Sequence, residues 1–131
     1  MITRLDQAIE KQNEQELLTC IADLFKQTEP IDESYYPKLE KLLFEKWHHE
    51  HEEIIGLIWL KDLKDERFID PLMLIAQQRE IYRPYDDELE STLRKCVHAL
   101  KTIGTEASNA AVKKLQDTGN VNVKSALENY Q

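Results

Sequence analysis

The segment LKDLKDERFIDPL, residues 60–72, decides the fold, because a second segment, LKTIGTEASNAAV at residues 100–112, matches it at an offset of 40 residues. In the matched pairs both side chains are apolar or both suit a helix cap: Leu60 with Leu100, Leu63 with Ile103, Asp65 with Thr105, Leu72 with Val112, and Ile75 with Leu115. In each copy one helix ends, a polar residue caps the next helix, and an apolar helix follows. A joint repeated at this spacing predicts stacked helical pairs that bury a continuous core.

Helical spacing of apolar residues extends over most of the remaining chain. In the first half of the chain we expect a helix with Leu5 and Ile9, a helix with Leu17 to Phe25 that ends near Gln27, a helix capped by Asp32 or Ser34 with Leu39 to Leu43, and a helix from about His48 to Leu63. In the second half we expect a helix capped by Asp65 with Phe68 to Ile75, and a helix from Asp86 or Asp87 to Ile103 that is followed by Gly104. Two further helices are expected from Ala107 to Gln116 and from Val121 to Tyr130. The segment from Glu80 to Asp86 has the pattern of a connecting loop. Since strand patterns are absent, we expect an all-α fold.

The composition fits one soluble helical domain that spans residues 1–131. Domains usually hold about 100–150 residues, so the chain is long enough to bury one core. It has 3 Gly and 4 Pro, too few for a loop-rich sandwich or barrel, which needs a turn about every 8–12 residues. Charged residues make up 32% and hydrophobic residues 41% of the chain, which argues against a disordered or a membrane protein.

Charge is distributed unevenly along the chain. Residues 1–90 hold 11 Lys and Arg against 22 Asp and Glu, a net charge of −11, whereas residues 91–131 hold 6 against 3, a net charge of +3. An acidic surface repels phosphate backbones, so we expect no direct binding of DNA or RNA. A basic protein is the natural complement of such a surface.

We expect the chain to be cytoplasmic and not to bind or cross a membrane. Cys20 and Cys96 lie in apolar helical patterns, as small buried thiols of a reducing compartment do, although a bridge between them stays open. Residues 2–15 alternate in charge and lack the apolar stretch of a signal peptide. The longest apolar run, Ile54 to Leu60, has seven residues and is too short to span a bilayer.

The strings LKDLKDERFIDPL (residues 60–72) and ALKTIGTEASNAAVKKL (residues 99–115) resemble the bacterial HEAT-repeat pattern, which covers roughly residues 48–118 here. The resemblance implies a right-handed α-solenoid of about three HEAT-like hairpins with extra N-terminal helices. Small acidic proteins of this architecture are similar to immunity proteins of interbacterial toxin systems. The resemblance therefore implies a protein that binds a cognate basic toxin domain, such as a nuclease, and occludes its active site.

The cluster HHEHEE, residues 48–53, is the strongest candidate for metal chemistry. Its first two histidines have carboxylates four residues further on, where both groups could face one cation on a helix. A zincin helix requires a second His four residues after the first, and the position four after His49 holds Glu53. Since acidic residues favour the first turn of a helix, we interpret the cluster as a solvent-exposed helix start with no metal and no cofactor.

An aromatic and acidic segment at the expected loop is the main candidate for partner binding. It comprises Tyr82, Tyr85, Asp86, Asp87 and Glu88. Tyr is a favoured anchor of protein interfaces, and neighbouring acids suit a basic partner. The alternative is that the two tyrosines close the loop over neighbouring helix ends and that the acids cap the next helix.

The helix expected over residues 48–63 carries apolar residues outside the stripe that faces the core. Ile54 and Ile58 stand where the matched helix has polar residues. This flank either packs against the N-terminal helices, which we expect, or forms an exposed hydrophobic patch. The region around Trp47 and Glu50 on this flank is the second candidate for partner binding.

Two other classes of function stay open. A HEAT-repeat scaffold or adaptor would bind proteins without a toxin partner. A HEAT-type DNA glycosylase or chromophore lyase would be an enzyme, but such a glycosylase grips DNA through a basic face, opposite in sign to residues 1–90. The chain has no Gly-rich phosphate loop, Cys-x-x-Cys pair or Gly-x-Ser-x-Gly elbow, so we expect no catalytic residue and no enzyme.

We predict that elemental analysis finds no stoichiometric zinc in the protein purified without a polyhistidine tag. The reason is that the His49 register lacks its second histidine. One equivalent of zinc per chain that disappears in a His48→Ala/His51→Ala variant would contradict this prediction.

Overall fold

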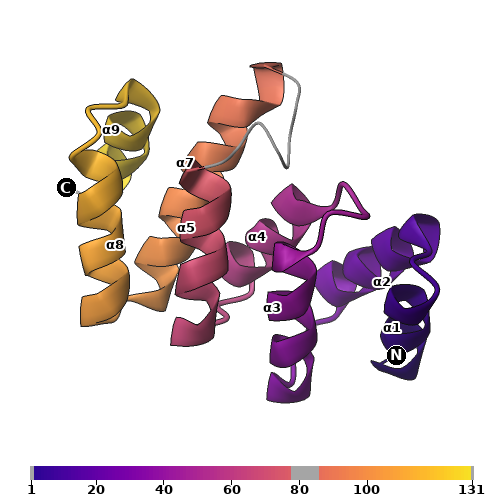
Figure 1. Ribbon diagram of the computed structural model, residues 1–131. Coiled ribbons are helices and arrows are strands. Elements are labelled where there is room, and N and C mark those ends of the chain that lie inside the picture. The colour runs from indigo at the N-terminus through magenta and orange to yellow at the C-terminus, as the bar shows by residue number, and fades with distance from the viewer. Residues whose placement is uncertain (1, 78–85, 131) are drawn as a thin grey trace.

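The computed structural model describes residues 2–77 and 86–130, which form helices joined by turns (Figure 1). The α-helices are α1 (Ile2–Glu10), α2 (Glu14–Lys26), α3 (Tyr36–Phe44), α4 (His51–Leu60), α5 (Ile69–Gln77), α7 (Asp86–Ile103), α8 (Glu106–Gln116) and α9 (Val121–Leu127). Short 3-10 helices precede α3 and α5 and follow α9: η1 (Glu33–Tyr35), η2 (Glu66–Phe68) and η3 (Glu128–Tyr130). No strand occurs within the described ranges, so the expected all-α class is confirmed there. None of the helices in these ranges is both long and apolar enough to cross a membrane.

Consecutive helices alternate between two layers. In the first layer α3 packs against α5 and α5 against α8, side by side in Figure 1. An ion pair between Lys38 and Asp6 joins α1 to this layer. In the second layer α2 packs against α4, α4 against α7 and α7 against α9. One hydrophobic core is shared by both layers and extends from Leu5 to Ala126.

The two matched joints have the caps that the sequence predicts. The Asp65 side chain accepts a hydrogen bond from the Arg67 N–H at 2.9 Å. At the other joint the Thr105 hydroxyl accepts from the Ser108 N–H at 3.2 Å, and the Ser108 hydroxyl accepts from the Thr105 N–H at 2.9 Å, which completes a capping box. Gly104 ends α7 with a φ of +69°, a left-handed conformation that glycine adopts without steric cost.

The joints differ at Leu60, which the 40-residue offset pairs with a buried leucine of α7. Leu60 is 59% exposed. α4 ends at this residue and Asp62 takes a φ of +56°, whereas α7 continues to Ile103. The helix expected over residues 48–63 is therefore shorter at this end, because the chain turns early and brings Leu63 back to the core.

A third joint of the same kind connects α2 to α3. Residues 32–39, DESYYPKL, match residues 65–72, DERFIDPL, and the Asp32 side chain accepts a hydrogen bond from the Ser34 N–H at 2.8 Å. In both joints a 3-10 turn leads into the α-helix, and the leucine that ends each segment is fully buried. This joint lies 33 residues before the joint that leads into α5, so the 40-residue match does not predict it.

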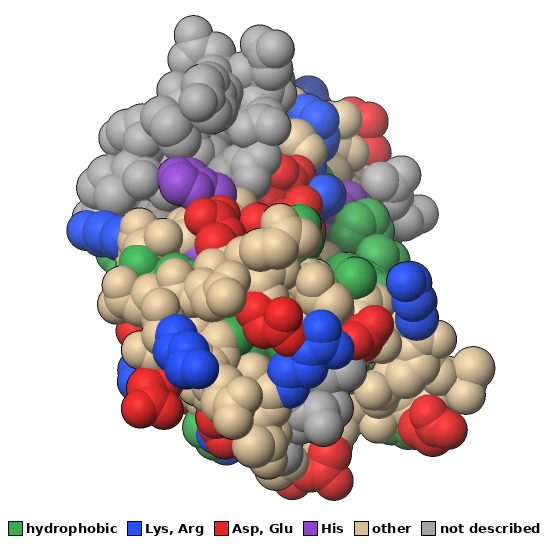
Figure 2. Space-filling view, turned by 90° about the vertical axis from the view of Figure 1, so that its right-hand side faces the viewer, with side chains coloured by type: hydrophobic (Ala, Val, Ile, Leu, Met, Phe, Trp, Pro, Cys, Tyr) green, Lys and Arg blue, Asp and Glu red, His purple; other side chains and the backbone are tan. Residues whose placement is uncertain are grey.

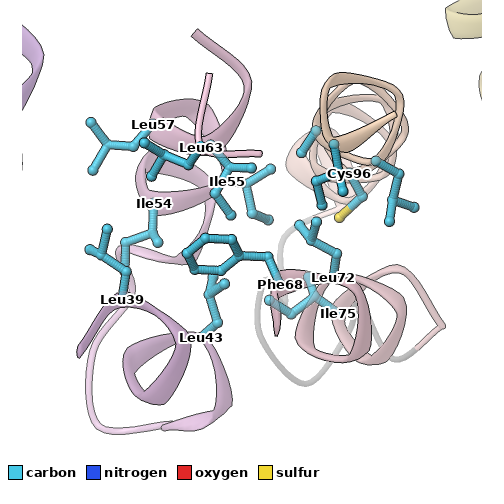
Figure 3. Packing of buried hydrophobic residues seen from close by; sticks show 14 of the residues in the cluster. Leu39, Leu43, Ile54, Ile55, Leu57, Leu63, Phe68, Leu72, Ile75 and Cys96 are labelled. Carbon is cyan, nitrogen blue, oxygen red and sulfur yellow. The ribbon is translucent and has the colours of Figure 1, made fainter. Parts of the chain in front are cut away.

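Phe68 lies at the centre of the core, in the joint before α5. Its side chain is fully buried. The ring meets the Tyr36 ring edge-on, with centroids 5.6 Å apart. Figure 3 shows it directed toward Leu39 and Leu43 of α3 and Ile54 of α4. One aromatic side chain from a joint therefore packs against both helices of the preceding pair.

The apolar flank of α4 is buried, as expected. Ile54 and Ile58 have no exposed surface, because α4 packs against α2, α3 and α7. The two isoleucines therefore form no exposed patch. Cys20 and Cys96 are likewise buried, and neither forms a disulfide.

Replacing Phe68 by Ala should lower the free energy of unfolding by about 3–5 kcal/mol, the usual cost of deleting a large aromatic side chain from a packed core. Urea denaturation followed by far-ultraviolet circular dichroism measures this loss. Phe44→Ala is the matched control: the Phe44 residue is 42% exposed, and its replacement should cost less than about 1 kcal/mol. Equal losses in the two variants would contradict the central position of Phe68.

Candidate functional site

The first turns of α2 and α4 lie next to each other. The Glu14 carboxylate, in the first turn of α2, accepts a hydrogen bond from the His49 N–H at 2.9 Å, just before α4. At the opposite ends of the two helices, the Lys61 ammonium donates to the Gln27 carbonyl oxygen at 3.0 Å. Because start meets start and end meets end, α2 and α4 run parallel.

α4 and α7 also run parallel. The Ser91 hydroxyl donates to the Glu52 carboxylate at 2.9 Å near the start of α4. Near the end of α4 the rings of Trp59 and His98 stack, with centroids 4.4 Å apart. α2, α4 and α7 therefore begin at one edge of the second layer. We call it the amino-terminal edge; it consists of the first turns of these three helices and of the α3–α4 turn, residues 45–50.

Acidic residues occupy the helix starts along the amino-terminal edge. The first turn of α2 holds Glu14 and Glu16, and that of α4 holds Glu52 and Glu53. α7 begins with residues 86–88, which are all acidic. A helix start carries about half a positive charge and favours acids, so each of these residues has a local explanation. Parallel packing gathers these local preferences into a single row.

The side chains of five predicted partner-binding residues lie outside the part of the chain that the structure describes. Tyr82 and Tyr85 lie outside the described residues. Asp86, Asp87 and Glu88 form the start of α7, as expected, but their side chains also lie outside the described part of the chain. Their role in binding therefore stays a prediction.

Trp47 and Glu50, the other predicted partner-binding residues, lie in the same α3–α4 turn. The Trp47 ring meets the His48 ring edge-on, with centroids 4.9 Å apart. Its indole N–H is buried and has no hydrogen-bond partner among the residues that the structure describes. Glu50 is the N-cap residue of α4, and its backbone N–H donates to His48 Nδ1 at 3.0 Å. Both candidates therefore belong to the amino-terminal edge.

The three histidines near the start of α4 correct the prediction of a solvent-exposed helix start. His48 and His51 are each 1% exposed, and only His49 is exposed. His48 Nε2 lies 2.8 Å from the Leu42 carbonyl oxygen, and His51 Nε2 lies 2.6 Å from that of Glu45. The last carbonyl oxygens of a helix have no intrahelical N–H donor. At the end of α3 the two imidazoles bind such carbonyl oxygens. α4 consequently begins at His51, later than expected, because the residues before it form this turn.

Glu52 is buried as well, which corrects the expectation that the carboxylates of this helix start are solvated. Its Oε1 lies 2.9 Å from Lys95 Nζ, in addition to its contact with Ser91. Such pairing is what a buried carboxylate requires. Among the side chains that the structure describes, no three His, Cys, Asp or Glu residues converge on a position that could hold a metal ion.

Trp59, His98 and Tyr130 form an aromatic bridge that the sequence does not predict. Beyond the stack of Trp59 on His98, His98 Nδ1 lies 2.7 Å from Tyr130 Oη, and Lys101 Nζ lies 5.3 Å from the centre of the Tyr130 ring. Burial lowers the pKa of His98 and raises the pKa of Tyr130. No sequence signal marks the bridge, because its members come from α4, α7 and η3 and meet only through helix packing.

Three acidic residues at the α1 end of the molecule are paired with basic ones. Figure 2 faces this end and shows acidic and basic side chains intermixed over it. Arg4 forms ion pairs with Glu16 and Asp23, and Lys38 forms one with Asp6. Glu16 is therefore neutralised, although it belongs to the first turn of α2.

Comparisons with known proteins assign the chain to no family. No family model matches it, no curated protein matches it, and no solved structure matches it.

Replacing Tyr130 by Phe should remove the hydroxyl contact to His98 and keep the ring beside Lys101. We expect the free energy of unfolding to fall by about 0.5–1.5 kcal/mol, the usual net contribution of one hydrogen bond. Tyr130→Ala removes the ring contacts as well and should cost more. Thermal denaturation followed by circular dichroism tests both variants. If neither differs from the parent, the aromatic bridge does not hold the C-terminal helix in place.

Proposed function

We propose that the helices form a right-handed, HEAT-like α-solenoid of about three hairpins with extra N-terminal helices. Two observations support this architecture. Consecutive helices alternate between two layers, and three joints share a side-chain cap that follows a second-layer helix. Solenoids of this kind use extended surfaces to bind other macromolecules.

Within that architecture the chain acts as a cytoplasmic immunity protein. It neutralises a cognate basic toxin domain, such as a nuclease, by covering its active site, and it is itself neither an enzyme nor dependent on a cofactor. The observation that carries this proposal is the amino-terminal edge, at which three parallel helices begin with acidic residues. A basic surface is the electrostatic complement of such an edge.

The acids of the edge outweigh the charge of the helix starts beneath them. Each helix start supplies about half a positive charge, whereas the first turn of α4 alone holds two carboxylates, Glu52 and Glu53. Lys95 neutralises one of them. Since fields in physiological salt decay over about 8 Å, gathered acids steer a partner more effectively than acids spread over the chain.

Trp47 is the proposed anchor of the complex. Tryptophan is enriched among the residues that dominate interface energies. The Trp47 side chain is half-buried in the α3–α4 turn, so the exposed part of its ring can pack against a partner. Tyr82 and Tyr85 precede the acidic start of α7 in the sequence and are proposed as further anchors.

A scaffold or adaptor without a toxin partner is the second candidate. The same acidic edge supports it, because it would fit any basic protein surface. A DNA glycosylase is disfavoured by the net charge of −11 on residues 1–90, since DNA binding needs a basic surface.

Surface plasmon resonance against the purified product of an adjacent toxin-like gene, at two salt concentrations, tests the proposal. Asp86→Lys/Asp87→Lys/Glu88→Lys should slow association about tenfold and weaken its salt dependence, because acids at the edge steer the approach. Trp47→Ala should instead speed dissociation about 30-fold, which corresponds to a hot-spot loss of about 2 kcal/mol.

Glu29→Lys/Glu33→Lys/Glu66→Lys is the matched control for the charge reversal. It changes the net charge equally, at exposed positions that follow the carboxyl ends of α2 and α4. It should leave the association rate within about twofold of the parent's, since these residues are far from the amino-terminal edge. Each variant must keep the parent's helical signal. Equal slowing by both triple variants would overturn the role of the edge, absence of any binding would favour the adaptor, and retardation of duplex DNA at low salt would favour the glycosylase.

A further inference from the structure

His48 joins α3 to α4 through both of its ring nitrogens. Its Nε2–H donates to the Leu42 carbonyl oxygen at 2.8 Å, and its Nδ1 accepts from the Glu50 N–H at 3.0 Å. The side chain is buried, so solvent water does not reach the ring to replace either contact. A ring that donates at one nitrogen and accepts at the other is a neutral imidazole. We call these two contacts the His48 clasp.

A proton on Nδ1 is incompatible with the clasp. In the imidazolium both ring nitrogens carry hydrogen and donate, so the Nδ1–H would face the Glu50 N–H, donor against donor. The positive charge would also be buried away from water, which is costly without a partner. Protonation therefore breaks the contact between His48 and the residue that begins α4.

Charged groups around His48 offer the protonated ring a partner. Glu14 of α2 and Glu45 of the α3–α4 turn act on it as negative charges, and His49 acts as a like charge. His51 of α4 stacks on the ring, with centroids 4.2 Å apart. Burial is the largest influence and lowers the pKa of His48. Glu45 Oε1 is buried without a hydrogen-bond partner in the described ranges, which makes it a ready acceptor.

We propose that the His48 clasp is a pH-sensitive switch, in which the neutral ring closes the α3–α4 turn and the protonated ring leaves Glu50 and pairs with the Glu45 carboxylate. The proton comes from solvent. When the Glu50 N–H is released, the first turn of α4 loosens. The Trp47 ring moves with it, because it rests edge-on against His48.

The direction of the pH dependence follows from the neutral closed form. In the unfolded chain a histidine titrates near its ordinary pKa of about 6.5, whereas the closed fold takes up the proton only at lower pH. The clasp therefore contributes its full stability above pH ~6.5 and loses it as the pH falls below that value. The loss reaches at most about tenfold in the folding equilibrium constant per pH unit.

The switch affects partner binding only if the proposed function holds, since that step rests on Trp47 and Glu50 as binding residues. These residues move when the clasp opens. The partner would then bind at neutral pH and dissociate in acid.

Nitrogen-15 NMR of the full chain, labelled at histidine and at the backbone, tests the clasp directly. At about pH 8 His48 should carry hydrogen on Nε2 and none on Nδ1. Once the ring is protonated, the Glu50 amide should lose at least about tenfold of its protection from hydrogen exchange. The opposite tautomer at pH 8, or unchanged protection of Glu50 after His48 protonation, would overturn the proposal.

A pair of matched variants provides the second measurement. His48→Gln keeps a donor and an acceptor but does not titrate, so it should abolish the pH dependence of Trp47 fluorescence, recorded in a Trp59→Phe background. His49→Gln removes the exposed neighbouring histidine and should keep that dependence. A response that survives His48→Gln, or that disappears in His49→Gln, contradicts the clasp. If His48→Gln does not fold, the NMR titration of the parent decides.

Binding measured at about pH 7.5 and pH 5.5 separates the switch from the proposed function. Weaker binding in acid by the parent, but not by His48→Gln, supports both. If the clasp opens in acid and the affinity for the partner stays unchanged, the proposed role of the amino-terminal edge in binding is wrong, but the switch itself is supported. An affinity that falls in acid while the NMR signals of His48 and Glu50 stay unchanged overturns the switch.

Discussion

The burial of α4, which is packed by α2, α3 and α7, is the constraint around which the other helices are arranged. Seven of its ten residues are buried. A helix with neighbours on several sides must be apolar around most of its circumference, which explains why its apolar residues exceed a single stripe. Gly56 leaves room for α2, because a Cβ at this position would lie 3.3 Å from Phe25 Cζ. That distance is tighter than ordinary packing, so a larger residue at this position would require the Phe25 ring to shift by a few tenths of an ångström.

Alternation between two layers has a consequence for the surface. Each first-layer helix returns the chain to the edge where the previous second-layer helix began, so α2, α4 and α7 run parallel. Acids that each helix start favours for its own electrostatic reasons are thereby brought to one edge. A local preference of α-helices thereby becomes a property of one edge of the molecule, and the proposed basic partner rests on this property.

Polar residues in the interior hold the α3–α4 turn in place. The buried imidazoles of His48 and His51 bind carbonyl oxygens at the end of α3, and the buried carboxylate of Glu52 is paired with Lys95 of α7. Apolar contacts alone are not directional, whereas these contacts specify one arrangement of the turn. The same directionality makes the turn sensitive to the protonation state of His48.

The sequence by itself determined the helices, the caps at Asp65 and Thr105, and the burial of Ile54, because caps and apolar spacing depend on a few consecutive residues. It also suggested Trp47 and Glu50 as partner-binding residues, because they lie on the flank of the helix that carries Ile54, and this role stays a prediction. Only the tertiary structure decided that the histidines beside them are buried and that Trp59 stacks on His98. The stack depends on how far α4 is shifted along α7, and two residues so far apart in the sequence carry no local pattern that fixes this shift. The burial of His48 and His51 depends on how the α3–α4 turn folds back onto the end of α3. A helical start of histidines and glutamates has the same sequence whether it faces water or the end of another helix.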